Sequence, residues 1–346
     1  MKIWKRSLIN ASIKAIYGYM VCKWIRVKYG KKTYIFLARG KTGDIFLYFR
    51  FLKPFLEKNN IKNYVIIGDC KNLKKIKDLY PEISAPCMET SEGLGLSLQT
   101  AYCFFGADNL HMSLSLMWDV DLPYNRCATR LTSKFNFIES YYWFLFDLNE
   151  QKVTPVKASF SQIDRKLEKE LKRQGIVKGK TVILSPYVYC VRTISPLFWR
   201  LIGADLEKKG YKVMVMLDGT KEKNEFGFPS VFFKYKDSVA ALEYAGYFIG
   251  LRSGFCNIIA GANCKKVILY PTLPKEFDGS VHRSDIYYSS LKCMGLSEDA
   301  VEITLPFARD ISNFEPETED FALRMEEDKK VVYAIKSHFP ELEYGV

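Results

Sequence analysis

One turn of the sequence, between a strand-like run and a helix-like run, contains residues that suit phosphate chemistry: Arg252, Ser253 and Gly254. The arginine brings a forked donor, the serine brings a hydroxyl, and the glycine lets a ligand approach the backbone closely. A turn that opens a helix also presents unpaired N–H groups and the positive end of the helix dipole. We therefore expect it to bind a phosphate or diphosphate. The alternative is structural, with Ser253 capping the helix and Arg252 in a salt bridge.

A second turn of this kind has Arg39, Lys41 and Gly43 around an acid, Asp44, at the start of another helix-like run. It matches neither the Walker A pattern nor the GxGxxG pattern of nucleotide-binding loops. The acid serves either as a helix cap or as a general base that removes a proton from an acceptor hydroxyl. Both hypotheses stay open, and the neighbouring residues are candidates for binding the substrate.

A third turn follows another strand-like run and reads SPYVYCVR, with Ser185, Tyr187 and Arg192 as binding candidates. Tyrosine rings stack on nucleobases, and an arginine holds phosphate. The alternative is a loop that packs its aromatic rings under the next helix.

Metal chemistry has little support in the sequence. Asp119 and Asp121 form a DxD pattern, which in one class of transferases holds a divalent metal on a nucleotide diphosphate, but three-residue patterns often arise by chance. The three histidines are scattered, and the nine cysteines include no CxxC pair. These features argue against a structural zinc and favour the reduced thiols of a cytosolic protein. We expect no metal site.

The elements that must position these turns follow one pattern in both halves of the chain. Strand-like runs such as 33–40 and 63–70 alternate with helix-like runs, which predicts α/β domains with parallel sheets and crossover helices. We expect two tandem Rossmann-like domains, 33–165 and 166–346, that face a central cleft and follow an N-terminal segment, 1–32. Ligands of such folds bind at the carboxyl ends of strands, where the three turns lie.

The positive charge is confined to one end of the chain. The formal net charge is +12, but residues 1–43 hold 11 of the 51 Lys and Arg and no acid. The remaining residues therefore carry 40 basic and 39 acidic side chains and are nearly neutral. A groove for nucleic acid needs positive charge elsewhere too, so we expect no nucleic-acid partner.

The segment 1–32 reads as a basic amphipathic helix. Its apolar residues recur every three or four positions, and its least charged stretch is shorter than the roughly 20 residues that a membrane span requires. One hypothesis is that the helix lies on an anionic membrane surface, which makes the protein peripheral at the cytoplasmic, inner face of the cell membrane. The other is that it packs its stripe on the protein body. The stripe consists of Ile9, Ile13, Ile16, Met20 and Trp24.

Together, three segments resemble the heptosyltransferase-like glycosyltransferases of bacterial polysaccharide biosynthesis. Their N-terminal domain opens with a segment similar to GDIFLYFRFLKPF, and their C-terminal domain opens with one similar to VILSPYVYCVRTISPLFWRLIGADLEKKGYKVMV. Their donor-phosphate turn resembles AALEYAGYFIGLRSGFCNIIAGANCKKVILYP, especially in the IGLRSG variant of polysaccharide-cluster enzymes. The resemblance covers residues 33–75 and 180–271.

The resemblance implies a GT-B architecture and inverting transfer of a sugar without a metal or cofactor, from a nucleotide-sugar donor to a saccharide or lipid-linked acceptor. Asp44 matches the base of the family, and Gly254 with its neighbours matches the diphosphate turn. The family usually has Asp-Thr-Gly and then a histidine in this turn. Here the turn has Arg252 as its first residue, and Asn257 lies further on, which argues against heptose as the donor sugar.

Two other functions stay open. A pyruvyl transferase acting on polysaccharide would use a similar two-domain scaffold without a nucleobase pocket. A non-catalytic partner would bind nucleotide or glycan without turnover.

Overall fold

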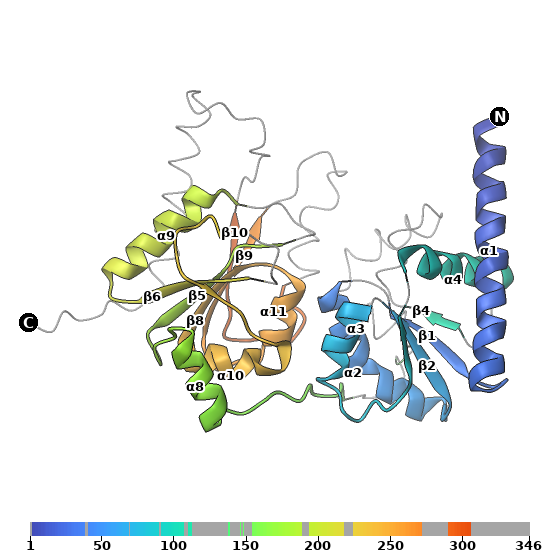
Figure 1. The fold of residues 1–346 in the computed structure, drawn as a ribbon, viewed down its shortest axis with the longest axis horizontal. Coiled ribbons are helices and arrows are strands. Elements are labelled where there is room, and N and C mark those ends of the chain that lie inside the picture. Colours follow the sequence, from blue (N-terminus) through green and yellow to red (C-terminus); the bar gives the residue numbers. More distant parts are fainter. Residues whose placement is uncertain are drawn as a thin grey trace, which may run out of the picture. The chain divides into compact units, whose positions relative to one another are not determined.

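The chain divides into two compact units, Met1–Ser159 and Phe160–Val346, each of which is described by itself. The computed structural model describes residues 2–38, 41–68, 70–89, 91–106, 110–112, 138, 146, 148, 154–188, 194–217, 224–271 and 290–305 (Figure 1).

The first unit contains one parallel sheet with the strand order β3-β2-β1-β4. Helices connect consecutive strands, as parallel pairing requires. The elements in chain order are α1 (Lys2–Tyr29), β1 (Tyr34–Ala38), α2 (Thr42–Lys58), β2 (Tyr64–Gly68), α3 (Cys70–Lys77), β3 (Cys87–Glu89), α4 (Glu92–Phe105) and β4 (Leu110–Met112).

Alternation along β1 explains why helices cover both faces of this sheet. Ile35 and Leu37 point to one face, where they pack in a buried cluster with Ile25 of α1 and Leu98 of α4. Phe36 points to the other face, where its ring contacts aromatic rings of α2. A strand buried on both sides reads as a continuous apolar run, which is what the sequence shows.

The second unit also contains a parallel sheet, with the strand order β10-β9-β8-β5-β6-β7. From β5 onward, a described helix stands between successive strands except between β6 and β7 and between β9 and β10, where part of the chain lies outside the described residues. Its elements are α8 (Arg165–Arg173), β5 (Thr181–Ser185), α9 (Pro196–Lys208), β6 (Lys212–Met216), β7 (Ser230–Val231), α10 (Tyr235–Ala245), β8 (Gly246–Leu251), α11 (Gly254–Ile259), β9 (Lys265–Pro271) and β10 (Val301–Leu305).

One face of this second sheet is covered by α9. The helix starts where its sequence predicts, because the Ser195 hydroxyl accepts a hydrogen bond from the Phe198 N–H and proline occupies the first helical position. Trp199 and Ile202 of α9 are buried against Val182 and other residues of the central strands. The opposite face contacts α10 and α11.

The predicted fold class, two tandem α/β units with Rossmann-like parallel sheets, is confirmed. The sequence did not predict α4, β3, β4, β7 or β10, and α11 begins three residues before the helix-like run NIIAGA. A helix expected near residues 140–148 lies almost entirely outside the described residues, although Phe146 and Leu148 are buried. Among the described helices, none is long and apolar enough to cross a membrane. The cleft between the domains stays a prediction.

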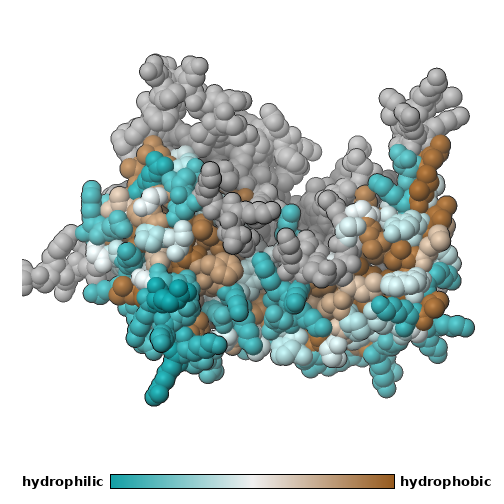
Figure 2. All heavy atoms as spheres, viewed as in Figure 1, coloured by the Kyte–Doolittle hydropathy of each residue, from teal (hydrophilic) through white to brown (hydrophobic). Residues whose placement is uncertain are grey.

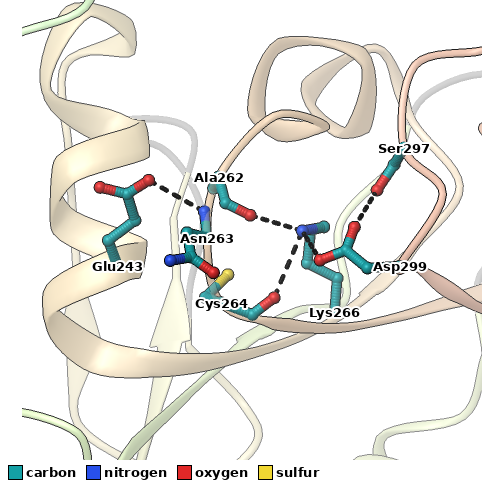
Figure 3. Close-up of polar contacts among 7 residues, drawn as sticks. All are labelled: Glu243, Ala262, Asn263, Cys264, Lys266, Ser297 and Asp299. Atoms are coloured by element: carbon teal, nitrogen blue, oxygen red, sulfur yellow. Dashed lines mark hydrogen bonds and ion pairs between the residues drawn. The ribbon is translucent and has the colours of Figure 1, made fainter.

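A buried lysine holds the start of β9 in place. The Lys266 ammonium is fully buried and donates hydrogen bonds to the carbonyls of Ala262 and Cys264 and, at 2.9 Å, to the carboxylate of Asp299 (Figure 3). Burial raises the pKa of Asp299, but hydrogen bonds from Ser297 and Lys266 outweigh it and lower that pKa below its usual value. The lysine thereby ties β9 to the segment that leads into β10.

We predict that Lys266→Met lowers the free energy of unfolding by about 2 kcal/mol, because it removes the ammonium that donates to Ala262, Cys264 and Asp299. Urea denaturation measures this, and Lys265→Met is the matched control, expected to change stability by less than about 0.5 kcal/mol. The lowered pKa of Asp299 stabilises the fold above the unfolded value of about 3.9, and this contribution is lost as pH falls. The difference in the free energy of unfolding between wild type and Lys266→Met should therefore become smaller below about pH 4. If Lys266→Met and Lys265→Met lower the free energy of unfolding equally, the stabilising role assigned to Lys266 is wrong.

Candidate functional site

The carboxyl ends of the central strands of the second unit bring together two of the predicted turns. The chain runs from β5 outward through β6 and β7 on one side, then returns to add β8, β9 and β10 on the other. The direction of strand order therefore reverses between β5 and β8, and open α/β sheets bind ligands at this switch point. Ser185 at the end of β5 is paired with Gly250 of β8, so the turn after β5 and the turn after β8 start side by side.

A side chain at position 250 would collide with its surroundings. A Cβ built there would lie 2.6 Å from the ring of Phe248 and 3.1 Å from the Cβ of Ser185. Glycine thus permits the close packing of β5 and β8 directly below the turn.

The turn after β8 is fixed by its arginine. The Arg252 N–H donates to the carbonyl of Leu269 on β9 at 2.8 Å. The guanidinium folds toward α11, where it donates to Oδ1 of Asn257 at 2.7 Å and to the carbonyl of Ser253. Both of these acceptors are neutral, so these contacts do not cancel the positive charge of the arginine.

Ser253 occupies the N-cap position of α11 with an extended backbone, but its side chain makes no capping hydrogen bond. The part of the structural alternative in which the Ser253 side chain caps the helix is therefore wrong, whereas a structural salt bridge of Arg252 stays a prediction. Its hydroxyl lies 3.7 Å from the sulfur of Cys256, which is buried. Gly254 begins the helix, and the Cys256 N–H two residues on already donates to the Ser253 carbonyl at 3.1 Å. The arrangement offers hydrogen-bond donors and one positive charge to an anion.

Tyr270, near the end of β9, belongs to the same neighbourhood and was missed in the sequence. Burial raises the pKa of its hydroxyl, and the charge of Arg252 is close enough to lower that pKa in part. The hydroxyl donates to the carboxylate of Glu302 on β10, which also accepts from the Ser290 hydroxyl and the Leu291 N–H. Its position at a strand end was the only sequence signal.

The residues after β5 are partly described. Ser185 is buried, and Tyr187 is half-buried with its ring 5.4 Å from that of Phe226 in an edge-to-face contact. This contact agrees with the alternative in which the loop packs its aromatic rings. Arg192 lies outside the described residues, and nucleobase stacking by Tyr187 stays a prediction.

In the first unit, Lys41, Gly43 and Asp44 lie together just after β1, where α2 begins. The Lys41 N–H donates to Oδ2 of Asp44 at 2.9 Å, and the Asp44 N–H donates back to the Lys41 carbonyl. Asp44 therefore acts as a cap of α2, as one of the two hypotheses for it proposed. A carboxylate has several acceptor sites, so capping is compatible with a second role as a base. Arg39 lies outside the described residues.

With this geometry established, the chain can be compared with known proteins. No protein-family model and no curated protein matches the sequence. Among solved structures, it is similar to a family 9 glycosyl transferase from Veillonella parvula DSM 2008, with a TM-score of 0.51 and 12% identity over 89% of this chain and 97% of that one. For the E. coli ADP-heptose lps heptosyltransferase II, the TM-score is 0.50, with 13% identity over 88% of this chain and 99% of that one. The chain has a GT-B fold.

A third similar structure is the dodecameric iron-containing heptosyltransferase TibC, in complex with ADP-D-β-D-heptose. Its TM-score is 0.50 with 14% identity over 88% of this chain and 75% of that chain. At these identities the likeness extends to the GT-B fold and not to the chemistry, which has to be argued from the residues.

The described residues contain no group of three His, Cys, Asp or Glu side chains placed to hold a metal ion. Asp119 and Asp121 lie outside them. Five cysteines whose side chains the structure describes form no disulfide: Cys22, Cys87, Cys256, Cys264 and Cys293.

The capping role of Asp44 yields a stability prediction. Asp44→Ala should lower the free energy of unfolding by about 1 kcal/mol, because α2 loses both the bond from Lys41 and a negative charge at its N-terminus. Asp44→Asn keeps an acceptor oxygen and should lose less. Asp164, whose side chain accepts from Leu167 N–H at the start of α8, is the matched position for comparison. If Asp164→Ala destabilises the protein and Asp44→Ala does not, Asp44 is no cap.

Proposed function

We propose that this protein is a glycosyltransferase that moves a sugar from a nucleoside-diphosphate donor to an acceptor hydroxyl. One observation carries the proposal: at the switch point of the second sheet, neutral acceptors hold the guanidinium of Arg252 beside the start of α11. A fixed positive charge next to backbone donors suits the diphosphate that leaves in sugar transfer.

The donor is a nucleotide sugar. Two of the similar structures support this class, since one is named for ADP-heptose and another contains ADP-D-β-D-heptose. The arginine in the turn of this chain argues for a sugar other than heptose. In this proposal Ser253, Gly254 and Asn257 complete the diphosphate site, while Ser185, Tyr187 and Arg192 hold the nucleoside. The last of these lies outside the described residues.

The reaction inverts the anomeric centre and uses no metal. Asp44 removes the proton from the acceptor hydroxyl, whose oxygen attacks the anomeric carbon as the bond to the diphosphate breaks. Arg252 stabilises the charge that develops on the leaving diphosphate, a task that a metal performs in other transferases. Arg39, Lys41 and Gly43 bind the acceptor.

The acceptor is a saccharide on a lipid carrier in bacterial surface-polysaccharide synthesis, so the enzyme works peripherally at the inner face of the cell membrane. The concentration of positive charge in residues 1–43 supports this placement, because the cytoplasmic leaflet is anionic.

The first test is a thermal-shift panel with UDP, GDP, CDP, dTDP and ADP, each with and without Mg²⁺. One diphosphate should stabilise the wild type by about 2.7 kcal/mol at 100 times its dissociation constant, with or without the metal. Arg252→Ala should abolish most of this shift, because the diphosphate loses its charged donor.

The control for that panel is Arg173→Ala, which removes an exposed arginine of the same unit that pairs with Glu170 on α8. It should keep the full shift. A shift that requires Mg²⁺ and survives Arg252→Ala would favour a metal site involving Asp119 and Asp121. No shift with any nucleotide, together with stabilisation by phosphoenolpyruvate, would favour pyruvyl transfer.

Asp44→Asn should reduce turnover by roughly 10²–10⁴-fold, because the amide accepts no proton from the attacking hydroxyl. Release of nucleoside diphosphate from the donor that the panel selects, with extracted membrane lipids as acceptor, measures this rate. Nucleotide binding should stay unchanged in the variant. Near-wild-type turnover in a folded variant would show that another group is the base, and binding without turnover in the wild type would favour a non-catalytic partner.

A further inference from the structure

The helix α1 is apolar on two opposite sides. One side faces α4 and consists mainly of small residues, among them the buried Ala15, Gly18 and Cys22. A Cβ built on Gly18 would lie 2.0 Å from the carbonyl oxygen of Ser97 on α4, so the two backbones touch at this point. Ile25 extends this side and is fully buried. The helix is thereby anchored to its own domain.

The opposite side is exposed although its side chains are larger. Six residues at spacings of three and four form an outer stripe, which covers about 27 Å of the helix at 1.5 Å per residue. Figure 2 shows hydrophobic residues along this side of α1. The stripe and its exposed fractions are Ile9 59%, Ile13 60%, Ile16 53%, Met20 63%, Trp24 51% and Val27 83%.

This finding separates the two hypotheses for the N-terminal segment. If the stripe packed on the protein body, its side chains would be buried, and all six are more than half exposed. The body contacts the other side of the helix instead. An apolar strip of this length on a folded protein marks a surface that something else covers.

The charges beside the outer stripe indicate what covers it. Lys23 and Lys28 flank the stripe on its two sides by helical geometry, and their amines lie 5.2 Å from the ring of Tyr19 and 5.1 Å from the ring of Trp24. No acidic residue occurs before Asp44. An anionic surface with an apolar interior matches both features, whereas two such helices from two copies would bring like charges together.

We propose that the outer stripe of α1 lies flat on an anionic phospholipid surface, with its apolar side chains in the acyl boundary and Lys23 and Lys28 at the headgroups. Trp24 suits the headgroup level because its ring is amphipathic. This inference deepens the membrane placement in the proposed function and rests on it for the choice of the cytoplasmic leaflet. It adds a defined contact face, held by the packing of α1 on α4.

Sedimentation with vesicles tests the proposal on the full chain. Vesicles with 30% phosphatidylglycerol in phosphatidylcholine should bind the wild type, and pure phosphatidylcholine vesicles should bind it far less. Ile13→Ser combined with Met20→Ser should lower the partition coefficient at least about tenfold, since two apolar side chains leave the acyl boundary. Lys23→Gln combined with Lys28→Gln should lower the partition coefficient about fivefold for each lysine. In 0.5 M salt the partition coefficients of this variant and of the wild type should become equal, because salt screens the charges.

The matched control is Val177→Ser, which changes an apolar side chain of the second unit that is 48% exposed. It should leave vesicle binding unchanged. Unchanged melting temperatures should show that the outer-stripe variants fold, because the replaced side chains are exposed. Failure of the wild type to bind anionic vesicles, or equal binding by the outer-stripe variants, would overturn the proposal.

Two further outcomes separate this proposal from its alternatives. A wild-type dimer in sedimentation velocity that Ile13→Ser with Met20→Ser converts to a monomer, without vesicle binding, would assign the outer stripe to a second copy of the chain. The nucleotide panel provides the other readout: the outer-stripe variants should keep the wild-type shift. Vesicle binding without any nucleotide shift would leave this inference standing and overturn the proposed function alone.

Discussion

The parallel ladder between β5 and β8 is the constraint on which the second unit depends. It aligns Ser185 with Gly250, and the buried side chains of both strands alternate between the two faces of the sheet. A slip of one residue would turn every buried side chain to the opposite face, so the register is strongly specified. Because all strands are parallel, the fixed register also fixes the edge at which Arg252 emerges. Residues far apart in the chain meet at this edge for that reason.

Within that edge, the partners of Arg252 make it suitable for an anion. Its N–H is tied to β9, and its guanidinium is oriented by Asn257. An aspartate at position 257 would orient the guanidinium equally well but would cancel its charge. An amide orients the group without adding a negative charge, so in the proposed function the arginine would lose little side-chain freedom on binding a diphosphate. Asparagine at position 257 therefore fits the proposed role of Arg252.

Apolar runs between glycine turns were enough to predict the central strands, and Ser195 followed by Pro196 was enough to predict the start of α9. Among the elements that escaped prediction, α4, β3, β4 and the two-residue β7 have weak local signals. Two glycines interrupt the first turns of α4, Gly93 and Gly95, and β3 and β4 have three residues each. The role of Asp44 as a cap was one of two hypotheses because a carboxylate at a helix start suits both. Tyr270 escaped because its relation to Arg252 exists only across neighbouring strands.

The two sides of α1 show what periodicity leaves open. The sequence revealed the stripe of isoleucines, Met20 and Trp24, but the side that packs on α4 is built from Ala15, Gly18 and Cys22, which have smaller side chains. The side with small residues packs on α4 because small side chains let the two helix backbones approach closely. Close contact adds dispersion energy along the whole interface. Burying the outer stripe instead would remove more apolar surface from water. The fold leaves this apolar face of α1 exposed, beside lysines and without acids, so the chain itself does not gain that free energy. In the proposed contact with a lipid surface, burial of the outer stripe would supply it.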